Sequence, residues 1–171
     1  MSDNRELLKC PACQKDMKKV FVPKEGVNID ICLDGCGGMW FDNREIKYFD
    51  EQNEKVDEII AAIEGKEFEK VDQSNHRSCP ACGARMVKNF SSVKKEIQID
   101  ECYACGGKFL DNSELQAMRA EYVTESDRSA DMVSFMYATV GADIKKLDAE
   151  VAELASQRSW LKKVFDKMVL G

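Results

Sequence analysis

The sequence has almost no histidine, a residue on which many catalytic sites depend. It holds a single histidine, His76, in 171 residues. A two-histidine metalloprotease helix therefore cannot be built from this sequence. A Ser/His or Cys/His pair could use only His76. A glycine-rich phosphate loop is missing as well. These absences argue against an enzyme.

Long apolar runs are also missing. No stretch approaches the roughly 20 consecutive apolar residues of a membrane-spanning helix, which argues against an integral membrane protein. The opening Met-Ser-Asp-Asn-Arg-Glu lacks the basic and apolar regions of a secretory signal. We therefore expect a cytoplasmic protein, in a reducing compartment where clustered cysteines more often bind metal than form disulfides. The net charge of −6 argues against a general polyanion binder.

Cysteine is the residue that stands out. The eight cysteines form four close pairs, and the pairs form two sets with 18 and 19 residues between the pairs of a set. Two ligands on one tight turn and two more about twenty residues later is the spacing of a tetrahedral thiolate zinc site. The two predicted sites are Cys10, Cys13, Cys32 and Cys36, and Cys79, Cys82, Cys102 and Cys105. We therefore expect two Zn²⁺ ions as cofactors.

The two cysteine sets lie in copies of one module. Cys-Pro-Ala-Cys occurs at both 10–13 and 79–82, and each copy has a methionine four residues later. Ile-Asp-x-Cys and Cys-Gly-Gly-x-(Trp/Phe)-(Phe/Leu)-Asp-Asn-x-Glu-(Ile/Leu) then follow in both. A module of about forty residues is too small to fold on apolar burial alone, so the metal must contribute much of its folding free energy.

These motifs resemble the transcription-factor-IIB-type zinc ribbon found in small bacterial proteins. The resemblance covers about residues 8–48 and 77–118. It implies a rubredoxin-like ribbon with one Zn²⁺ on each set of four cysteines. The first copy has three residues between Cys32 and Cys36 where the second has two, and we expect the extra residue to bulge at Gly35.

The expected fold class is a small, metal-stabilised α+β protein with two tandem three-stranded ribbons. The pattern predicts strands over 17–22, 27–31 and 39–41, and over 86–90, 93–99 and 108–110. It also predicts a connecting helix over 43–64 and a short helix after Asp111. The expected domains are residues 1–48 (first ribbon), 49–76 (acidic helical connector), 77–120 (second ribbon) and 121–171 (C-terminal helical region).

The C-terminal region carries two apolar patterns. One stripe runs from Met132 to Val140 and stops at Gly141. Beyond it, apolar residues recur in alternating steps of three and four, as in a coiled coil, with Arg158 as one interruption. Either the region folds back as a helical hairpin, or it pairs with another chain. The residues expected to self-associate are Ile144, Leu147, Val151, Leu154, Leu161, Phe165 and Met168.

Three functions stay open on this pattern. The leading hypothesis is a non-catalytic adaptor that binds another protein, because the metal sites are closed and the C-terminal apolar residues need a cover. The second is nucleic-acid binding by the second ribbon, where Phe109 could stack on bases, although packing is the favoured role for both Phe109 and Trp40. Its contacts would be Arg85, Lys88, Lys94, Lys95, Lys108 and Phe109.

The third hypothesis is thiol redox or electron transfer. Cys-Pro-Ala-Cys is similar to a dithiol active site, and thiolate sets accept iron as well as zinc. Two duplicated sets of four do not suit a single reactive dithiol, so this is the least favoured of the three. His76 lies three residues before Cys79, but four thiolates already fill that site, so we expect His76 to be exposed to solvent.

Overall fold

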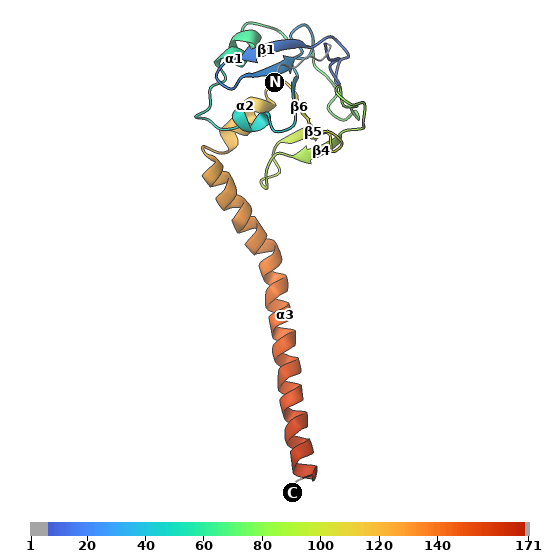
Figure 1. Cartoon of the computed structure of the whole chain (residues 1–171), viewed down its shortest axis with the longest axis vertical. Coiled ribbons are helices and arrows are strands. Elements are labelled where there is room, and N and C mark those ends of the chain that lie inside the picture. Colours follow the sequence, from blue (N-terminus) through green and yellow to red (C-terminus); the bar gives the residue numbers. More distant parts are fainter. Residues whose placement is uncertain (1–6, 170–171) are drawn as a thin grey trace. The chain divides into compact units, whose positions relative to one another are not determined.

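The computed structural model describes residues 7–169, except for the side chains of 142 and 162–169. It divides into two compact units, Met1–Arg128 and Ser129–Gly171. The first unit contains the six strands, and the second consists of a long helix (Figure 1). Both cysteine sets and the connector between them lie in the first unit.

The two ribbons share one sheet. The first copy supplies β1 (Lys18–Val22), β2 (Val27–Ile31) and β3 (Met39–Phe41), and the second supplies β4 (Val87–Phe90), β5 (Gln98–Glu101) and β6 (Lys108–Leu110). All neighbours are antiparallel, in the order β1-β2-β3-β6-β5-β4. The sequence predicts two three-stranded ribbons. The structure adds that they join edge to edge.

The joint lies between the last strands of the two copies. Trp40 is opposite Phe109, with Met39 opposite Leu110 and Phe41 opposite Lys108. Since Trp40 and Phe109 are matching positions of the two copies, the pairing is symmetric about them. A strand that would otherwise be a free edge is thereby paired on both sides.

One apolar core serves both copies. Phe41 and Ile31 of the first copy pack in the same buried cluster as Ile99 and Leu110 of the second. Three short helical elements complete the cluster, namely η1 (Ile46–Tyr48), α1 (Asp57–Ile63) and α2 (Glu114–Glu121). The shared core supplies the apolar burial that a module of about forty residues would not have alone.

The connecting helix expected over 43–64 is mostly absent. Only η1 and α1 are helical there, and Arg44 adopts a left-handed φ of 71°. Arg119 on α2 donates hydrogen bonds to the carbonyl oxygens of Phe49, Gln52 and Glu54 at 2.6, 3.1 and 2.8 Å. Carbonyl groups held by a distant guanidinium do not accept helical bonds, so tertiary contacts override the helical pattern here.

The second hairpin also differs from its expected boundaries. The strand predicted over 93–99 begins only at Gln98. Before it the chain turns, with Lys95 at a φ of 60° and the Lys94 N–H donating to the Ser92 hydroxyl at 3.1 Å. The Ser92 hydroxyl in turn donates to Glu121 at 2.6 Å. Such side-chain bonds compete with a strand ladder.

The C-terminal region is one helix, α3 (Glu125–Val169), of 45 residues. Thr124 and Asp127 cap its start, because the Asp127 N–H donates to the Thr124 hydroxyl and the Thr124 N–H to Asp127. Gly141 does not interrupt it, so the first of the two alternatives, a fold-back into a hairpin, does not occur within 125–169. Among the described helices, none is long and apolar enough to cross a membrane.

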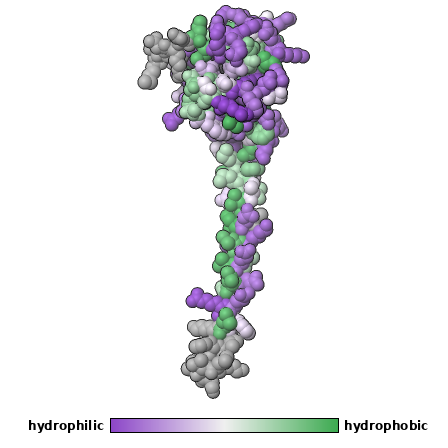
Figure 2. All heavy atoms as spheres, turned by 90° about the vertical axis from the view of Figure 1, so that its right-hand side faces the viewer, coloured by the Kyte–Doolittle hydropathy of each residue, from purple (hydrophilic) through white to green (hydrophobic). Residues whose placement is uncertain are grey.

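Exposed apolar side chains follow α3 along one stripe (Figure 2). Tyr137 is 76% exposed and Leu154 is 64% exposed. We call the stripe the α3 seam and define it by Val133, Tyr137, Val140, Ile144, Leu147, Val151, Leu154, Arg158 and Leu161. Phe165 and Met168, also expected to self-associate, lie outside the described side chains.

Candidate metal centres

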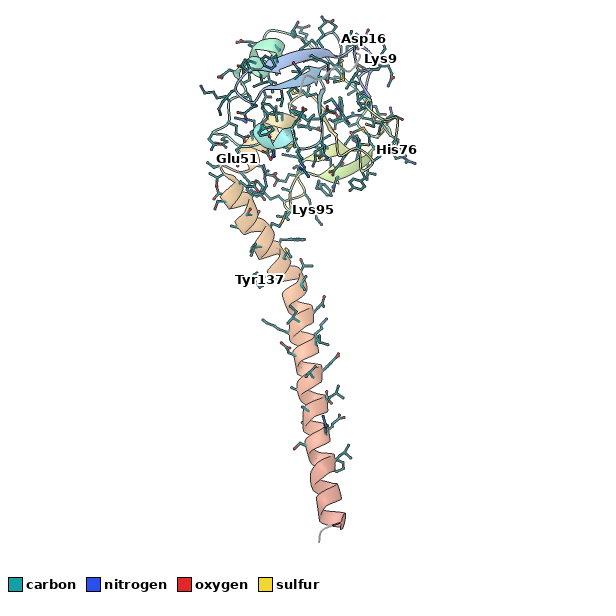
Figure 3. All side chains as sticks on the ribbon, viewed as in Figure 1. Lys9, Asp16, Glu51, His76, Lys95 and Tyr137 are labelled. Carbon is teal, nitrogen blue, oxygen red and sulfur yellow. The ribbon has the colours of Figure 1, made fainter. Side chains whose placement is uncertain are left out.

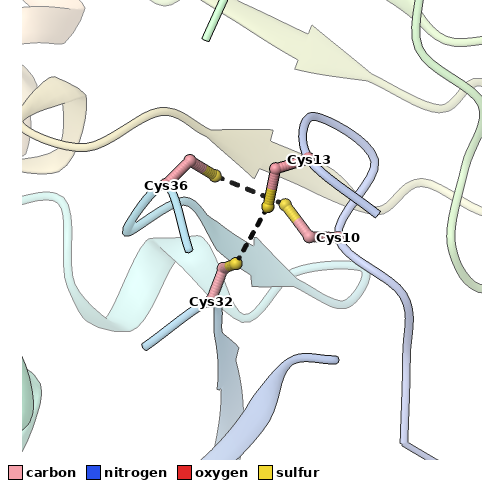
Figure 4. A group of neighbouring side chains, drawn as sticks. All are labelled: Cys10, Cys13, Cys32 and Cys36. Carbon is pink, nitrogen blue, oxygen red and sulfur yellow. Dashed lines mark hydrogen bonds between the residues drawn. The ribbon is translucent and has the colours of Figure 1, made fainter. Parts of the chain in front are cut away.

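The first cysteine set converges on one point. The Sγ atoms of Cys10 and Cys36 lie 3.4 Å apart, and those of Cys13 and Cys32 lie 3.3 Å apart (Figure 4). Cys10 and Cys13 come from the turn before β1, and Cys32 and Cys36 from the loop between β2 and β3. The metal would therefore connect the turn before β1 to the loop between β2 and β3.

The second set has the same arrangement. The Sγ atoms of Cys79 and Cys105 are 3.6 Å apart, and those of Cys82 and Cys102 are 3.5 Å apart. In both sets all four sulfur atoms lie within 4.8 Å of one another. Four thiolates at the ordinary Zn–S length of about 2.3 Å in a tetrahedron would be about 3.8 Å apart. The donor type, number and spacing fit one Zn²⁺ ion in each set.

Backbone hydrogen bonds shape the cysteine turns before any metal is considered. The Gln14 N–H donates to the Cys10 carbonyl and the Gly83 N–H to the Cys79 carbonyl, both at 2.9 Å. The Gly106 N–H donates to the Cys102 carbonyl at 2.7 Å. The matching bonds in both copies show that the repeated sequence folds into repeated turns.

The thiols of the first site differ in how readily they ionise, because their surroundings differ. A hydrogen bond with the Cys10 sulfur lowers the pKa of Cys36 to about 6, whereas burial raises the pKa of Cys32 to about 12. Burial also opposes ionisation of Cys102, but hydrogen bonds from the Cys105 backbone and neighbouring sulfurs lower its pKa to about 7. Cys36 and Cys102 thus ionise more readily than an ordinary thiol, and thiolate is the form that binds metal.

The extra residue of the first site is accommodated at Gly35, as predicted. Gly35 is buried, and a Cβ atom there would be 2.7 Å from the Cys32 sulfur and 2.8 Å from the Cys13 sulfur. A side chain would therefore push into the ligand set. The fit explains why the residue that bulges is a glycine.

The two sites differ in their access to solvent. In the first site Cys10, Cys32 and Cys36 are buried and Cys13 is half-buried. In the second site Cys82 is exposed and Cys105 is half-buried. A ligand that solvent can reach is easier for a competing chelator to displace.

Beside each metal site, a glycine packs against an aromatic ring from the other copy. A Cβ atom at Gly107 would lie 2.1 Å from the Trp40 ring, and one at Gly38 would lie 2.2 Å from the Phe109 ring. Both glycines directly follow the last cysteine turn of their copy. Trp40 and Phe109 are 1% and 0% exposed, which agrees with the packing role. A base-stacking role for Phe109 would require a surface that this ring does not have.

A buried ion cluster on the second ribbon is a feature that sequence reasoning missed. Arg77 donates to Asp100 and to Asp111, each at 2.8 Å, and its guanidinium lies 4.8 Å from the centre of the Phe109 ring. All three charged side chains are buried. A buried cation between two carboxylates is costly to remove, because Asp111 would lose its countercharge and Asp100 would keep only Lys88, 3.2 Å away.

The first ribbon has neutral residues at the positions of Arg77 and Phe109, while Asp30, the match of Asp100, pairs with Lys19 at 3.3 Å. Leu8 stands where the second copy has Arg77, and Trp40 stands where it has Phe109. The Trp40 indole N–H donates to Asp42, the match of Asp111, at 3.1 Å. An alignment of the two copies could have indicated the Arg77 cluster. The change from Trp40 to Phe109 removes a hydrogen-bond donor, and the change from Leu8 to Arg77 supplies one.

Several of the proposed nucleic-acid contacts already have partners within the protein. Lys88 pairs with Asp100 at 3.2 Å and Lys108 with Glu101 at 3.3 Å. Lys94 donates to the Glu121 carbonyl and lies over the Tyr122 ring. Arg85 and Lys95 are exposed. The basic surface available to phosphates is therefore smaller than the sequence suggests.

His76 is exposed and belongs to neither cysteine cluster, as expected (Figure 3). The ligand sets consist of sulfur alone.

Comparison with known proteins agrees with this geometry. Residues 9–47 and 78–120 each match the family model described as "Transcription factor zinc-finger", the zinc ribbon of the transcription-factor-IIB type. Each matched segment carries a complete Cys₄ site. No curated protein and no solved structure gave a match to the chain. The protein is thus a two-zinc ribbon protein whose ribbons share one sheet.

Proposed function

We propose that this is a non-catalytic protein-interaction or adaptor protein. Two zinc ions stabilise the double ribbon, and α3 presents the surface that a protein covers. The observation that carries the proposal is the α3 seam, whose apolar members are exposed over the described part of the helix. An apolar stripe of this length is normally buried against another element, and large exposed apolar patches mark interaction sites.

The metal sites support a structural role for zinc. A closed set of four thiolates leaves no open coordination position at which water or substrate could be activated. A reducing compartment such as the cytoplasm would keep the eight thiols available to zinc.

Nucleic-acid binding is the second candidate, supported by the description of the matching family and by the exposed Arg85 and Lys95. The intramolecular partners of Lys88, Lys94 and Lys108 weigh against it. Binding that depends on phosphate contacts weakens steeply as salt increases. Salt dependence therefore distinguishes the two candidates.

The test uses the zinc-loaded full chain. In fluorescence anisotropy against single- and double-stranded DNA and RNA, we expect no binding that weakens steeply as salt increases. Crosslinked protein complexes should be retained by the natural chain and lost in L147E/L154E. The matched control is A149E/S156E, which adds the same charges seven residues apart on the opposite face of α3. Steep, salt-dependent binding that K94E/K95E abolishes would put nucleic-acid recognition in place of the adaptor role.

A further inference from the structure

The α3 seam keeps one register through Gly141. From Val133 to Leu161 its members follow alternating steps of four and three, so the stripe before Gly141 and the pattern after it are one heptad series. Gly141 lies beside the seam, and a Cβ atom there would meet no atom within 4 Å. Because Gly141 has no side chain, one side of a shallow apolar groove stays open there. The groove is lined by Val133, Met136, Tyr137, Val140, Gly141 and Ile144.

Charge is distributed unevenly along the same helix. Residues 129–153 carry five acidic and two basic side chains, whereas residues 154–169 carry one acidic and four basic. A second copy lying in the same direction would place acidic beside acidic and basic beside basic. A copy lying in the opposite direction would place each basic end beside an acidic segment, which is the more favourable arrangement.

We propose that α3 pairs with α3 of a second copy of this chain in an antiparallel coiled coil. The inference deepens the proposed function by naming the protein that covers the α3 seam. In the register that places Tyr137 opposite Leu161 of the other copy, Ile144 faces Leu154 and Leu147 faces Val151.

The single charge in the seam fits this direction. In a parallel, in-register pair, Arg158 would face the same arginine of the other copy, and Asp143 and Asp148 would meet at the flanking positions. In the antiparallel pair Arg158 faces Val140 and has Asp143 of the other copy within reach. The parallel pair therefore brings like charges together at these positions, whereas the antiparallel pair brings Arg158 near the opposite charge of Asp143.

Gly141 adds a steric argument for the same register. The position beside it in the antiparallel pair is Ala155 of the other copy. Two small residues at facing positions let the helices approach closely, and the groove beside Gly141 then receives apolar side chains of the other copy. A mid-helix glycine is less favourable than alanine, so a contact that uses the open space offsets its presence.

The first measurement is the mass of the zinc-loaded full chain by sedimentation equilibrium over a range of concentrations. The expected mass is twice the 19.3 kDa of one chain. L147E/L154E should sediment as a single chain, and A149E/S156E should keep the doubled mass. Circular dichroism checks that both variants stay helical. A single-chain mass for the natural protein, or a trimer, would overturn the proposal.

The second measurement fixes direction. A photoreactive benzoylphenylalanine in place of Met136, which flanks the seam, should crosslink to residues 161–165 of the other copy. A parallel pair would instead give crosslinks to residues 137–141 and would also overturn the proposal. The same probe at Ala149, on the opposite face, is the background control. If the chain is single but crosslinked complexes with other proteins still depend on Leu147 and Leu154, the adaptor role stands and the self-pairing fails.

Discussion

Trp40 of the first ribbon lies directly opposite Phe109 of the second in the central strand pair, and each ring covers a glycine of the other copy. The covered glycines, Gly107 and Gly38, follow the second cysteine turn of each metal site. The sheet joint and the two metal loops are therefore parts of one packed structure. A change at the joint reaches both zinc sites.

Adding a methyl group at either covered glycine should destabilise the double ribbon. The new Cβ atom would lie 2.2 Å from Phe109 in Gly38→Ala and 2.1 Å from Trp40 in Gly107→Ala. Overpacking of this kind costs about 1–3 kcal/mol. Thermal unfolding of the zinc-loaded protein would show a lower Tm for both. Phe109→Leu should partly rescue Gly38→Ala, and two additive losses would contradict this steric account.

Removing the buried cation should be more severe. Arg77→Leu leaves Asp100 and Asp111 buried without their shared partner, and such losses cost about 3–5 kcal/mol. The first ribbon, with Leu8 and Trp40, suggests the compensation. R77L/F109W should recover part of the lost Tm, because the indole N–H can donate to Asp111 as Trp40 donates to Asp42. Phe109→Trp alone is the control, and a double variant no more stable than R77L would refute the exchange.

Glu114 should make stability depend on pH. Burial raises its pKa from 4.5 to about 7, while its carboxylate accepts the Asp111 N–H at 2.7 Å. A raised pKa means that its contribution is fully present below pH 4.5 and is lost as pH rises toward 7, by up to about 3 kcal/mol. Glu114→Gln keeps an acceptor without this loss. Between pH 5 and 7, at constant free zinc, the Tm of Glu114→Gln should therefore rise relative to that of the natural chain, and the difference should level off above pH 7. The exposed Glu96→Gln should show no such trend, and a constant offset for Glu114→Gln would count against burial as the cause.

The two zinc ions should leave at different rates. Cys82 is exposed whereas Cys10, Cys32 and Cys36 are buried, so a chelator should reach the second site first. Release followed with a coloured chelator should have two phases. Pulsed alkylation with mass spectrometry should then label Cys79, Cys82, Cys102 and Cys105 before the others. Simultaneous labelling of both sets would show that the sites open together.

Complete removal of zinc should unfold the ribbons and leave much of α3 helical. A structural zinc site contributes on the order of 10 kcal/mol to folding, and neither of the two cysteine sets includes a residue of α3. Trp40 reports on the first unit because it is buried, whereas Trp160 on α3 is 62% exposed. In Trp160→Phe, chelation should shift the fluorescence to longer wavelength while the helical circular dichroism signal largely persists. An unchanged spectrum from both probes would contradict the dependence of the fold on metal.

The sequence predicted the local parts of this structure well because they depend on local rules. Cysteine spacing and the duplicated turns placed both metal sites, and Gly35 marked the bulge. The edge-to-edge joint was not predicted, since nothing in a strand of three residues says which neighbour it pairs with. The connecting helix was overpredicted because Arg119, far along the chain, holds the carbonyl groups of that segment.

The Arg77 cluster was missed for a different reason. An arginine two residues before a cysteine turn looks like a surface residue, and only the contacts with Asp100 and Asp111 show that it is buried. Likewise, the continuity of α3 through Gly141 could not be read from composition, because glycine more often ends a helix than lies within one.

The pairing of β3 with β6 has the geometry of a two-fold dimer, in which equivalent positions exchange places across the axis. A single ribbon could in principle make the same contact with a free copy of itself, but only at sufficient concentration. Holding both halves in one chain removes that dependence. It also lets the halves become unequal, as the neutral Leu8 and Trp40 on one side and the charged Arg77 beside Phe109 on the other already are. The two zinc ribbons of one chain can therefore differ at matching positions and still keep the symmetric pairing of β3 with β6.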